Sequence, residues 1–293
     1  MTFSSDDVRD TAEWPAGLLA GAGRRWVMET FSVAQRAFAE AIGTALLVFV
    51  GAGSVPAILL LEGGTKAPFS GADLGFISMA FGLIVIAMVY TVGKVSGCHI
   101  NPAVTFGLAL TKRFPWREVP LYWGSQLAGG IAGGFAMWAA FGTRAVDLGY
   151  GFGVVHFDHS ATTWGSAMFI EALGTAILLF TILGIVDTRS PEGWAGLVIG
   201  LVIVGIIITV GPITNSSLNP ARAIGPLLIT TIHGGVHNWT QQLLAYIPGN
   251  LIGAGIACVA YDWMATPRKV LRPIKQAVTE PDRADLGVPV TTQ

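Results

Sequence analysis

Two short stretches of this sequence, "HINPAVT" at 99–105 and "SLNPARA" at 217–223, contain the same tripeptide, Asn-Pro-Ala. Asn is a strong N-cap residue, and Pro is favoured at the first position of a helix. Each tripeptide therefore predicts the start of a helix. The apolar segments 101–111 and 219–230 are so short that each predicted helix spans about 16 Å, half of a ~30 Å hydrocarbon core.

The rest of the chain has the composition of a membrane protein. Of its 293 residues, 52% are hydrophobic and 12% are charged, whereas soluble domains carry roughly 25% charge. A transmembrane helix needs ~20 mostly apolar residues, and one stretch, 193–221, is too long for a single simple helix. Six spans are predicted: 38–61, 74–93, 119–143, 160–186, 193–221 and 239–261.

Charge and cysteine content exclude other classes. The net charge of −1 argues against a nucleic-acid partner, which needs a clustered basic surface. Cys98 and Cys258 both lie in apolar surroundings and do not form a disulfide framework. The spans contain no nucleophile–base pair and no metal-ligand spacing, so we predict no enzyme, no cofactor and no metal site.

The basic residues set the predicted orientation. With the N-terminus placed inside the cell, fourteen of the seventeen Lys and Arg residues fall inside, Lys66 and Arg144 fall outside, and Arg222 lies within the membrane. Residues 1–34 and 265–293 are predicted to be polar cytoplasmic tails around a channel domain at 35–264. We expect an integral, multi-pass protein of the cell (inner or plasma) membrane, in contact with the lipid bilayer.

The two halves of the chain repeat one another. "EAIGTALLVF" at 40–49 aligns with "EALGTAILLF" at 171–180, which divides the domain into repeats at about 35–143 and 160–264. Each repeat has three spans, and three is odd, so the second copy is inserted upside down. The predicted fold is all-α: six transmembrane helices plus two re-entrant half-helices in an inverted 3+3 repeat, with the half-helices meeting tip to tip.

The paired Asn residues predict the chemistry of a channel. If the side-chain oxygens of Asn101 and Asn219 cap their own helices, both amide NH₂ groups remain as donors toward one lumen. A water that accepts from both turns its hydrogens away, which interrupts a proton wire. The two helix N-termini, each carrying about +0.5 charge, disfavour cations. Neutral hydrogen-bonding molecules pass and ions do not.

Unwound chain before each cap supplies further pore groups, because irregular backbone is tolerated in a membrane only where it lines a cavity. Glu40 and Glu171 occupy equivalent intramembrane positions, and we interpret them as acceptors for N–H groups of these loops rather than as a proton relay. The expected pore carbonyls belong to Gly97, Cys98, His99, Ile100, Asn215, Ser216 and Ser217.

These motifs resemble the aquaporin family, the major intrinsic proteins. The resemblance covers roughly residues 35–264 and rests on "AEAIGTALLVFVGAGS", "SGCHINPAVT", "EALGTAILLF" and "TNSSLNPARAIGP". It implies one pore per subunit, a homotetramer, and a narrow ring that contains the intramembrane Arg222. The residues it identifies are the motifs Asn101, Pro102, Ala103 and Asn219, Pro220, Ala221, and the ring Phe81, Ile207, Ser216 and Arg222.

The ring departs from both standard patterns of the family. Ile207 stands where strict water channels usually carry His, and Ala223 stands where glycerol-type members usually carry Asp. Ser216 and Ile207 also differ from the Phe and Gly of the glycerol type, and Phe81 from its larger aromatic. We expect a channel for water, with small neutral solutes such as glycerol, urea or ammonia as further permeants.

Alternative functions remain open at this point. A glycerol facilitator with water secondary and a gated or closed-pore junction protein use the same motifs, and a coupled transporter also uses inverted repeats. "HFDH" at 156–159, together with His233 and His237, suggests a metal or pH gate, but its spacing fits no standard site and solvated loop histidines are commoner.

Overall fold

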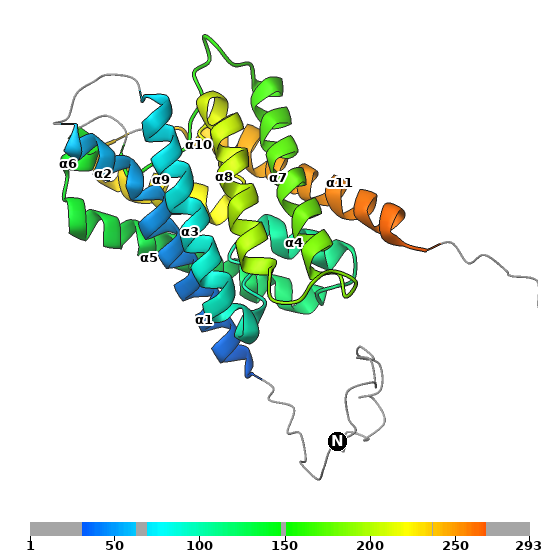
Figure 1. Cartoon of the computed structure of the whole chain (residues 1–293). Helices are drawn as coiled ribbons and strands as arrows, with labels where there is room; N and C mark the ends of the chain where they lie inside the picture. The colour runs from blue at the N-terminus through cyan, green and yellow to red at the C-terminus, as the bar shows by residue number, and fades with distance from the viewer. Residues whose placement is uncertain (1–30, 63–68, 148–150, 236, 268–293) are drawn as a thin grey trace, which may run out of the picture.

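The computed structural model describes residues 31–62, 69–147, 151–235 and 237–267, and these are nearly all helical (Figure 1). The expected tails lie almost wholly outside these residues, as does Lys66. The long helices are α3 (Gly71–Ser96), α5 (Val119–Phe141), α7 (Trp164–Val186) and α8 (Ala195–Thr214), together with two composite rods. These rods are α1–η1–α2 (Val33–Leu46, Leu47–Ala52, Ser54–Leu61) and α10–η3–α11 (Trp239–Gln241, Gln242–Tyr246, Ile247–Ala265).

Four shorter helices complete the described chain. Two are the segments that follow Asn-Pro-Ala, α4 (Pro102–Leu110) and α9 (Pro220–Ile232), and both are too short to cross a bilayer. The others are η2 (Trp116–Glu118) and α6 (Arg144–Asp147).

Local sequence explains where the helices begin and end. Ser32 and Ser70 each form a capping box at the start of α1 and α3, with Gln35 and Asp73 at the third position. The long apolar stretch 193–221 is interrupted because α8 ends at Thr214. The chain then turns away at Asn215, which adopts left-handed backbone angles.

Within the described residues, five helices or composite rods are long and apolar enough to span a membrane: 33–61, 71–96, 164–186, 195–214 and 239–265. The sixth predicted span is present as α5, a helix of 23 residues without a charged side chain. Its glycines and polar side chains, such as Gln126, make it less apolar than the others. The prediction of six long helices plus two half-helices is confirmed.

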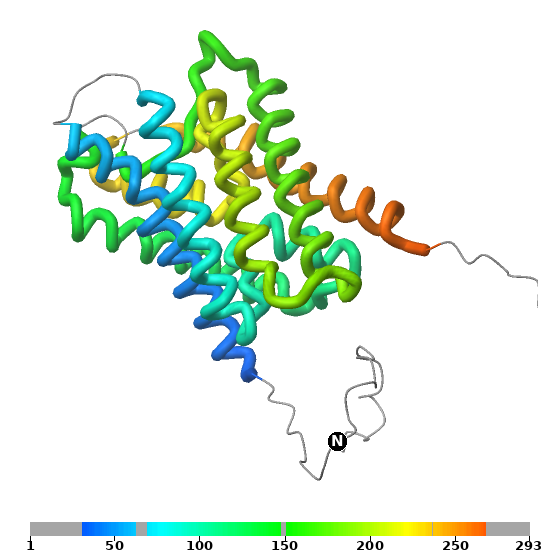
Figure 2. Tube along the Cα trace, in the orientation of Figure 1, coloured from blue at the N-terminus to red at the C-terminus, as the bar shows by residue number. Residues whose placement is uncertain are grey.

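The two halves pack in equivalent ways (Figures 1 and 2). α1 packs on α5, and its counterpart α7 packs on α11, while α3 and α8 pack together between the halves. In Figure 1, α1 begins at the bottom of the bundle and α11 ends at its right, and both of these ends are tied by ion pairs to the connection between α4 and α5. This agrees with six crossings, since an even number returns the chain to its starting side, and with three crossings in each half the second half is inverted.

Glycine permits the closest helix contacts. A Cβ added at Gly129 of α5 would overlap the carbonyl oxygen of Ala41 in α1. A Cβ at Gly253 of α11 would likewise overlap the carbonyl oxygen of Ala172 in α7. The small-residue spacing in these helices is therefore used within the subunit.

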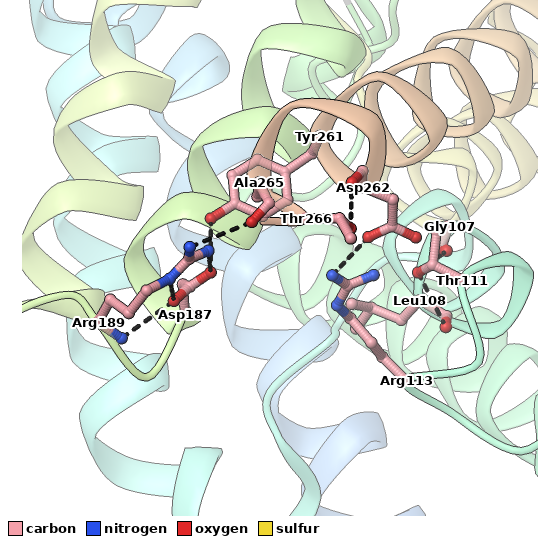
Figure 3. Close-up of polar contacts among 10 residues, drawn as sticks. All are labelled: Gly107, Leu108, Thr111, Arg113, Asp187, Arg189, Tyr261, Asp262, Ala265 and Thr266. Carbon is pink, nitrogen blue, oxygen red and sulfur yellow. Dashed lines mark hydrogen bonds and ion pairs between the residues drawn. The ribbon is translucent and has the colours of Figure 1, made fainter. Parts of the chain in front are cut away.

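Ion pairs join the helix ends on the side where α11 ends (Figure 3). Arg113, after α4, pairs with Asp262 of α11 at 2.6 Å. Arg189, after α7, binds Asp187 and donates to the carbonyl of Ala265 at 3.1 Å. The Arg189 guanidinium holds the pKa of the Asp187 carboxyl well below its usual range. The connections α4–α5 and α7–α8 are thus tied to the last helix.

Candidate functional site: a pore between two half-helices

The two Asn-Pro-Ala motifs meet at the centre of the fold. The side-chain oxygen of Asn101 accepts from the backbone N–H of Ala103 at 2.8 Å. That of Asn219 accepts from the N–H groups of Ala221 and Arg222 at 3.0 and 3.3 Å. Each Asn therefore caps its own half-helix, and Pro occupies the first helical position in both.

The side-chain amide of each Asn cap donates a hydrogen bond to the loop of the opposite half. Asn101 Nδ2 donates to the carbonyl of Leu218 and Asn219 Nδ2 donates to the carbonyl of Ile100, both at 2.8 Å. The expectation that the whole NH₂ group faces the lumen is therefore wrong, because one of its two hydrogens is used by the opposite loop. One N–H per Asn remains for a molecule in the cavity.

A buried carboxylate holds the loop before the first cap. Glu40, fully buried in α1, accepts from the backbone N–H groups of His99 and Ile100 at 2.9 and 2.6 Å. It also accepts from Ser96 Oγ and Gln126 Nε2 at 2.6 and 2.8 Å. Each oxygen receives two donors, which uses all four lone-pair sites of the carboxylate.

The second half repeats this arrangement. Glu171, fully buried in α7, accepts from the N–H groups of Ser217 and Leu218, both at 3.0 Å. Its other donors are Thr214 Oγ1 at 2.6 Å and Asn250 Nδ2 at 2.9 Å. Neither carboxylate is among the residues that line the cavity described below, so each acts on its loop from behind.

The two loops share an unusual backbone. In the first, Gly97, Cys98 and Ile100 have φ of 86°, 50° and 41°. Their counterparts in the second are Asn215, Ser216 and Leu218, with φ of 58°, 53° and 55°. Left-handed angles cost roughly 1–2 kcal/mol for a non-glycine residue. The hydrogen bonds to Glu40 and Glu171 offset this strain.

Two cavities share one constriction. The larger, of about 410 Å³ and here called the outer cavity, lies where α3 begins and contains Gly153, His156 and Asn215 in its wall. The other, of about 170 Å³ and here called the inner cavity, runs from Val186 and Ala195 past both Asn caps, with mostly aliphatic walls. Phe81, Ile207 and Arg222 line both cavities.

Arg222 dominates the polarity of this constriction. Its Nη1 donates to the carbonyl of Gly153 at 2.8 Å, and its guanidinium carbon lies 4.9 Å from the centre of the Phe81 ring. Its buried Nε and the buried Oγ of Ser216 have no partner among the described protein atoms. Both residues line the inner cavity with other parts of their surface, while these two atoms themselves are covered.

The remaining site residues divide between wall and support. Asn215 lines the outer cavity, whereas Gly97, Cys98, His99, Ile100 and Ser217 line the inner one. The His99 ring packs against Phe114 and Tyr122, with centroids 4.8 and 5.0 Å away. The Pro and Ala residues of the motifs, Pro102, Ala103, Pro220 and Ala221, are buried and line neither cavity.

The histidines that the sequence suggested as a gate are dispersed in the structure. His156 lines the outer cavity, and His159 contacts Gln241 and the ring of Trp164. His233 lies on the ring of Trp138. Within the described residues, no three His, Cys, Asp or Glu side chains are grouped to hold a metal ion.

Sequence reasoning missed several supporting residues. The hydroxyls of Tyr122 and Tyr246 donate to the carbonyls of Ser96 and Thr214, both at 2.8 Å, at the end of α3 and α8. Each Tyr stands four positions before the amide side chain that binds the carboxylate, as "YWGSQ" (122–126) and "YIPGN" (246–250). This shared Tyr-to-amide spacing was the available signal.

Fold and cavity together define a helical membrane channel built from an inverted repeat. The family model described as major intrinsic protein matches residues 27–261. Aquaporin AqpM of Methanothermobacter marburgensis is 41% identical over 246 residues, covering 80% of this chain and 99% of that protein. Aquaporin Z of Bradyrhizobium diazoefficiens is 38% identical over 232 residues, covering 78% and 92%.

A solved structure, the aquaglyceroporin from Plasmodium falciparum, is similar with a TM-score of 0.71 and 26% identity, covering 80% of this chain and 98% of that one. The chain therefore belongs to the major intrinsic protein family. It is an integral membrane channel and not an enzyme.

Proposed function

We propose that this chain is a passive channel for water, with glycerol, urea or ammonia as further permeants, which excludes protons and other ions. The observation that carries the proposal is the reciprocal pair of Asn caps in the wall of the inner cavity. Both caps turn a helix N-terminus toward the same point. A water there accepts from the remaining N–H of each Asn, and the two helix ends disfavour a cation.

The constriction supplies a second barrier. Arg222 is charged and lines both cavities at the constriction, so it repels cations there. Phe81 and Ile207 provide apolar walls, and Ser216 lines the inner cavity. The names of the similar proteins include both aquaporins and an aquaglyceroporin. A glycerol facilitator with water secondary is therefore the second candidate, and a closed-pore junction protein is the third.

The proposed domain bounds and membrane orientation are those that the sequence predicts. Residues 35–264 form the channel domain, with repeats at about 35–143 and 160–264, between cytoplasmic tails at 1–34 and 265–293. The basic residues near the helix ends support this orientation. Exposed apolar side chains cover the bundle, among them Phe38, Leu83 and Ile256, and they suit both lipid and the neighbouring subunits of a homotetramer in the cell membrane.

The test is osmotic flux in proteoliposomes that contain the full chain. We expect rapid shrinkage in sucrose with a low activation energy, and slower reswelling in glycerol. Ile207→Trp should block both fluxes because Ile207 lines the constriction. Ile208→Trp is the matched control, since Ile208 is 48% exposed on the outer surface of the bundle, and it should leave flux unchanged.

Each other outcome changes the assignment. Glycerol reswelling as fast as shrinkage would support the facilitator. Wild-type rates equal to those of empty liposomes would rule out an open channel and leave the junction protein.

A further inference from the structure

One segment of the outer wall carries the carbonyl that Arg222 binds. Residues 151–157, here called the strap, connect α6 toward α7, and Gly153 and His156 line the outer cavity. Because Arg222 Nη1 donates to the Gly153 carbonyl at 2.8 Å, the position of the strap determines where the guanidinium lies. Phe81 and Ile207 line the same constriction as Arg222.

Three amide side chains before α11 hold the strap from one side, and we call them the amide clamp. Asn238 Nδ2 and Gln242 Nε2 both donate to the carbonyl of Val155, at 2.7 and 3.1 Å. Gln241 binds Phe157 at both backbone groups: its Nε2 donates to the carbonyl at 2.9 Å, and its Oε1 accepts from the N–H at 3.3 Å.

The other side of the strap lies against the first half of the chain. Gly153 has a φ of 69°, and a Cβ there would overlap the carbonyl oxygen of Ala52 in η1. The strap is therefore enclosed between η1 and the clamp. Both π-helical segments of the described chain, η1 and η3, touch it, and such π turns occur frequently at functional sites.

Not every polar group of the clamp is satisfied. Two donors share the carbonyl of Val155, and the side-chain oxygens of Asn238 and Gln242 are buried without a partner among the described protein atoms. Buried unsatisfied acceptors are unfavourable and rare in native proteins. An arrangement that accepts this cost fits a role in positioning better than a role in stability.

We propose that Asn238, Gln241 and Gln242 are positioning residues that set the solute selectivity of the channel by fixing the strap and, through the Gly153 carbonyl, Arg222. The proposal rests on the proposed function. It extends the selectivity determinants from the ring that lines the pore to a set of side chains that do not touch the permeant.

The experiment measures the ratio of glycerol to water permeability in proteoliposomes of the full chain. The double variant Asn238→Leu/Gln242→Met removes both donors to Val155, and Gln241→Met removes both bonds to Phe157. Thr240→Val is the matched control, because Thr240 is exposed on the same turn and is absent from the contacts to the strap. Thermal unfolding in detergent is recorded for every variant.

We expect the double variant to raise the ratio about five-fold, the factor that corresponds to one neutral hydrogen bond. Its unfolding temperature should stay at that of Thr240→Val. An unchanged permeability ratio, with or without a lower unfolding temperature, would contradict the proposed role of the clamp in selectivity. If the double variant does not fold, the single variants Gln241→Met and Gln242→Met decide by the same criterion. Failure of the proposed function is distinct, since wild-type flux would then equal that of empty liposomes.

Discussion

The two loops that precede the half-helices have the same support but different walls. Glu40 and Glu171 each bind two backbone N–H groups, one hydroxyl and one side-chain amide, at matching positions. Three residues after each Asn cap, however, the first half has Val104 and the second has Arg222. The comparison teaches that the scaffold is duplicated, whereas the charged side chain of the constriction occurs in one half alone.

Removing one of the two buried carboxylates should have the largest effect on folding. The effect should be the same in the two halves. In Glu171→Ala, two backbone N–H groups, Thr214 and Asn250 lose their acceptor inside the membrane. Each unsatisfied group costs about 1–3 kcal/mol, so we expect no folded protein on size-exclusion chromatography in detergent. Glu40→Ala should fail in the same way. Full recovery of either variant would contradict the equivalence of the two supports.

Exchanging the differing wall residue should affect function more than folding. Arg222→Val gives the second half the residue of the first. We expect glycerol permeability to rise about ten-fold and protons to leak, because a charged donor worth about 1.5–3 kcal/mol is lost from the constriction. A pH-sensitive dye inside proteoliposomes measures the leak. Arg222→Lys is the control that keeps the charge, and it should remain proton-tight. An Arg222→Val variant that does not leak protons would mean that the Asn caps are sufficient to exclude protons without Arg222.

A smaller change sharpens the same constriction. Ile207→His adds a polar group opposite Arg222 without altering either loop. Glycerol should lose about 1 kcal/mol of apolar contact, so the glycerol-to-water permeability ratio should fall about five-fold. Ile208→His, on the outer surface of the bundle, is the control. An unchanged ratio for Ile207→His would show that this wall does not set selectivity.

The smallest expected effect concerns the face where α11 ends, far from both walls. Arg189 lowers the pKa of Asp187 from its usual 3.8. A lowered folded-state pKa contributes stability above the unfolded value, and this is lost as pH falls below about 4. Arg189→Met should therefore unfold at a slightly lower temperature than wild type at pH 7, with a gap that narrows below pH 4. A gap independent of pH would assign the effect to packing.

Much of this organisation could be predicted from the sequence because it is written twice. The Asn caps and the carboxylates Glu40 and Glu171 occur as repeated residue types, so one copy strengthened the interpretation of the other. The partner of Arg222 left no such signal, because the Gly153 carbonyl is a backbone group and its strap has no equivalent among the described residues of the first half. The hydrogen bonds from each Asn amide to the opposite loop could not be predicted either, since they depend on how closely two distant loops approach.

These two hydrogen bonds between the halves have a consequence for the synthesis of the protein. Each bond joins residues 117 or 119 positions apart in the chain. Ribosomes add about 5–20 residues per second, so Asn101 waits on the order of 10 s before Leu218 exists. During this interval the first re-entrant helix lacks an acceptor that its finished position requires. The pore therefore reaches its final structure only when the last third of the chain has been made. A nascent first half lacks both of these hydrogen bonds in the membrane.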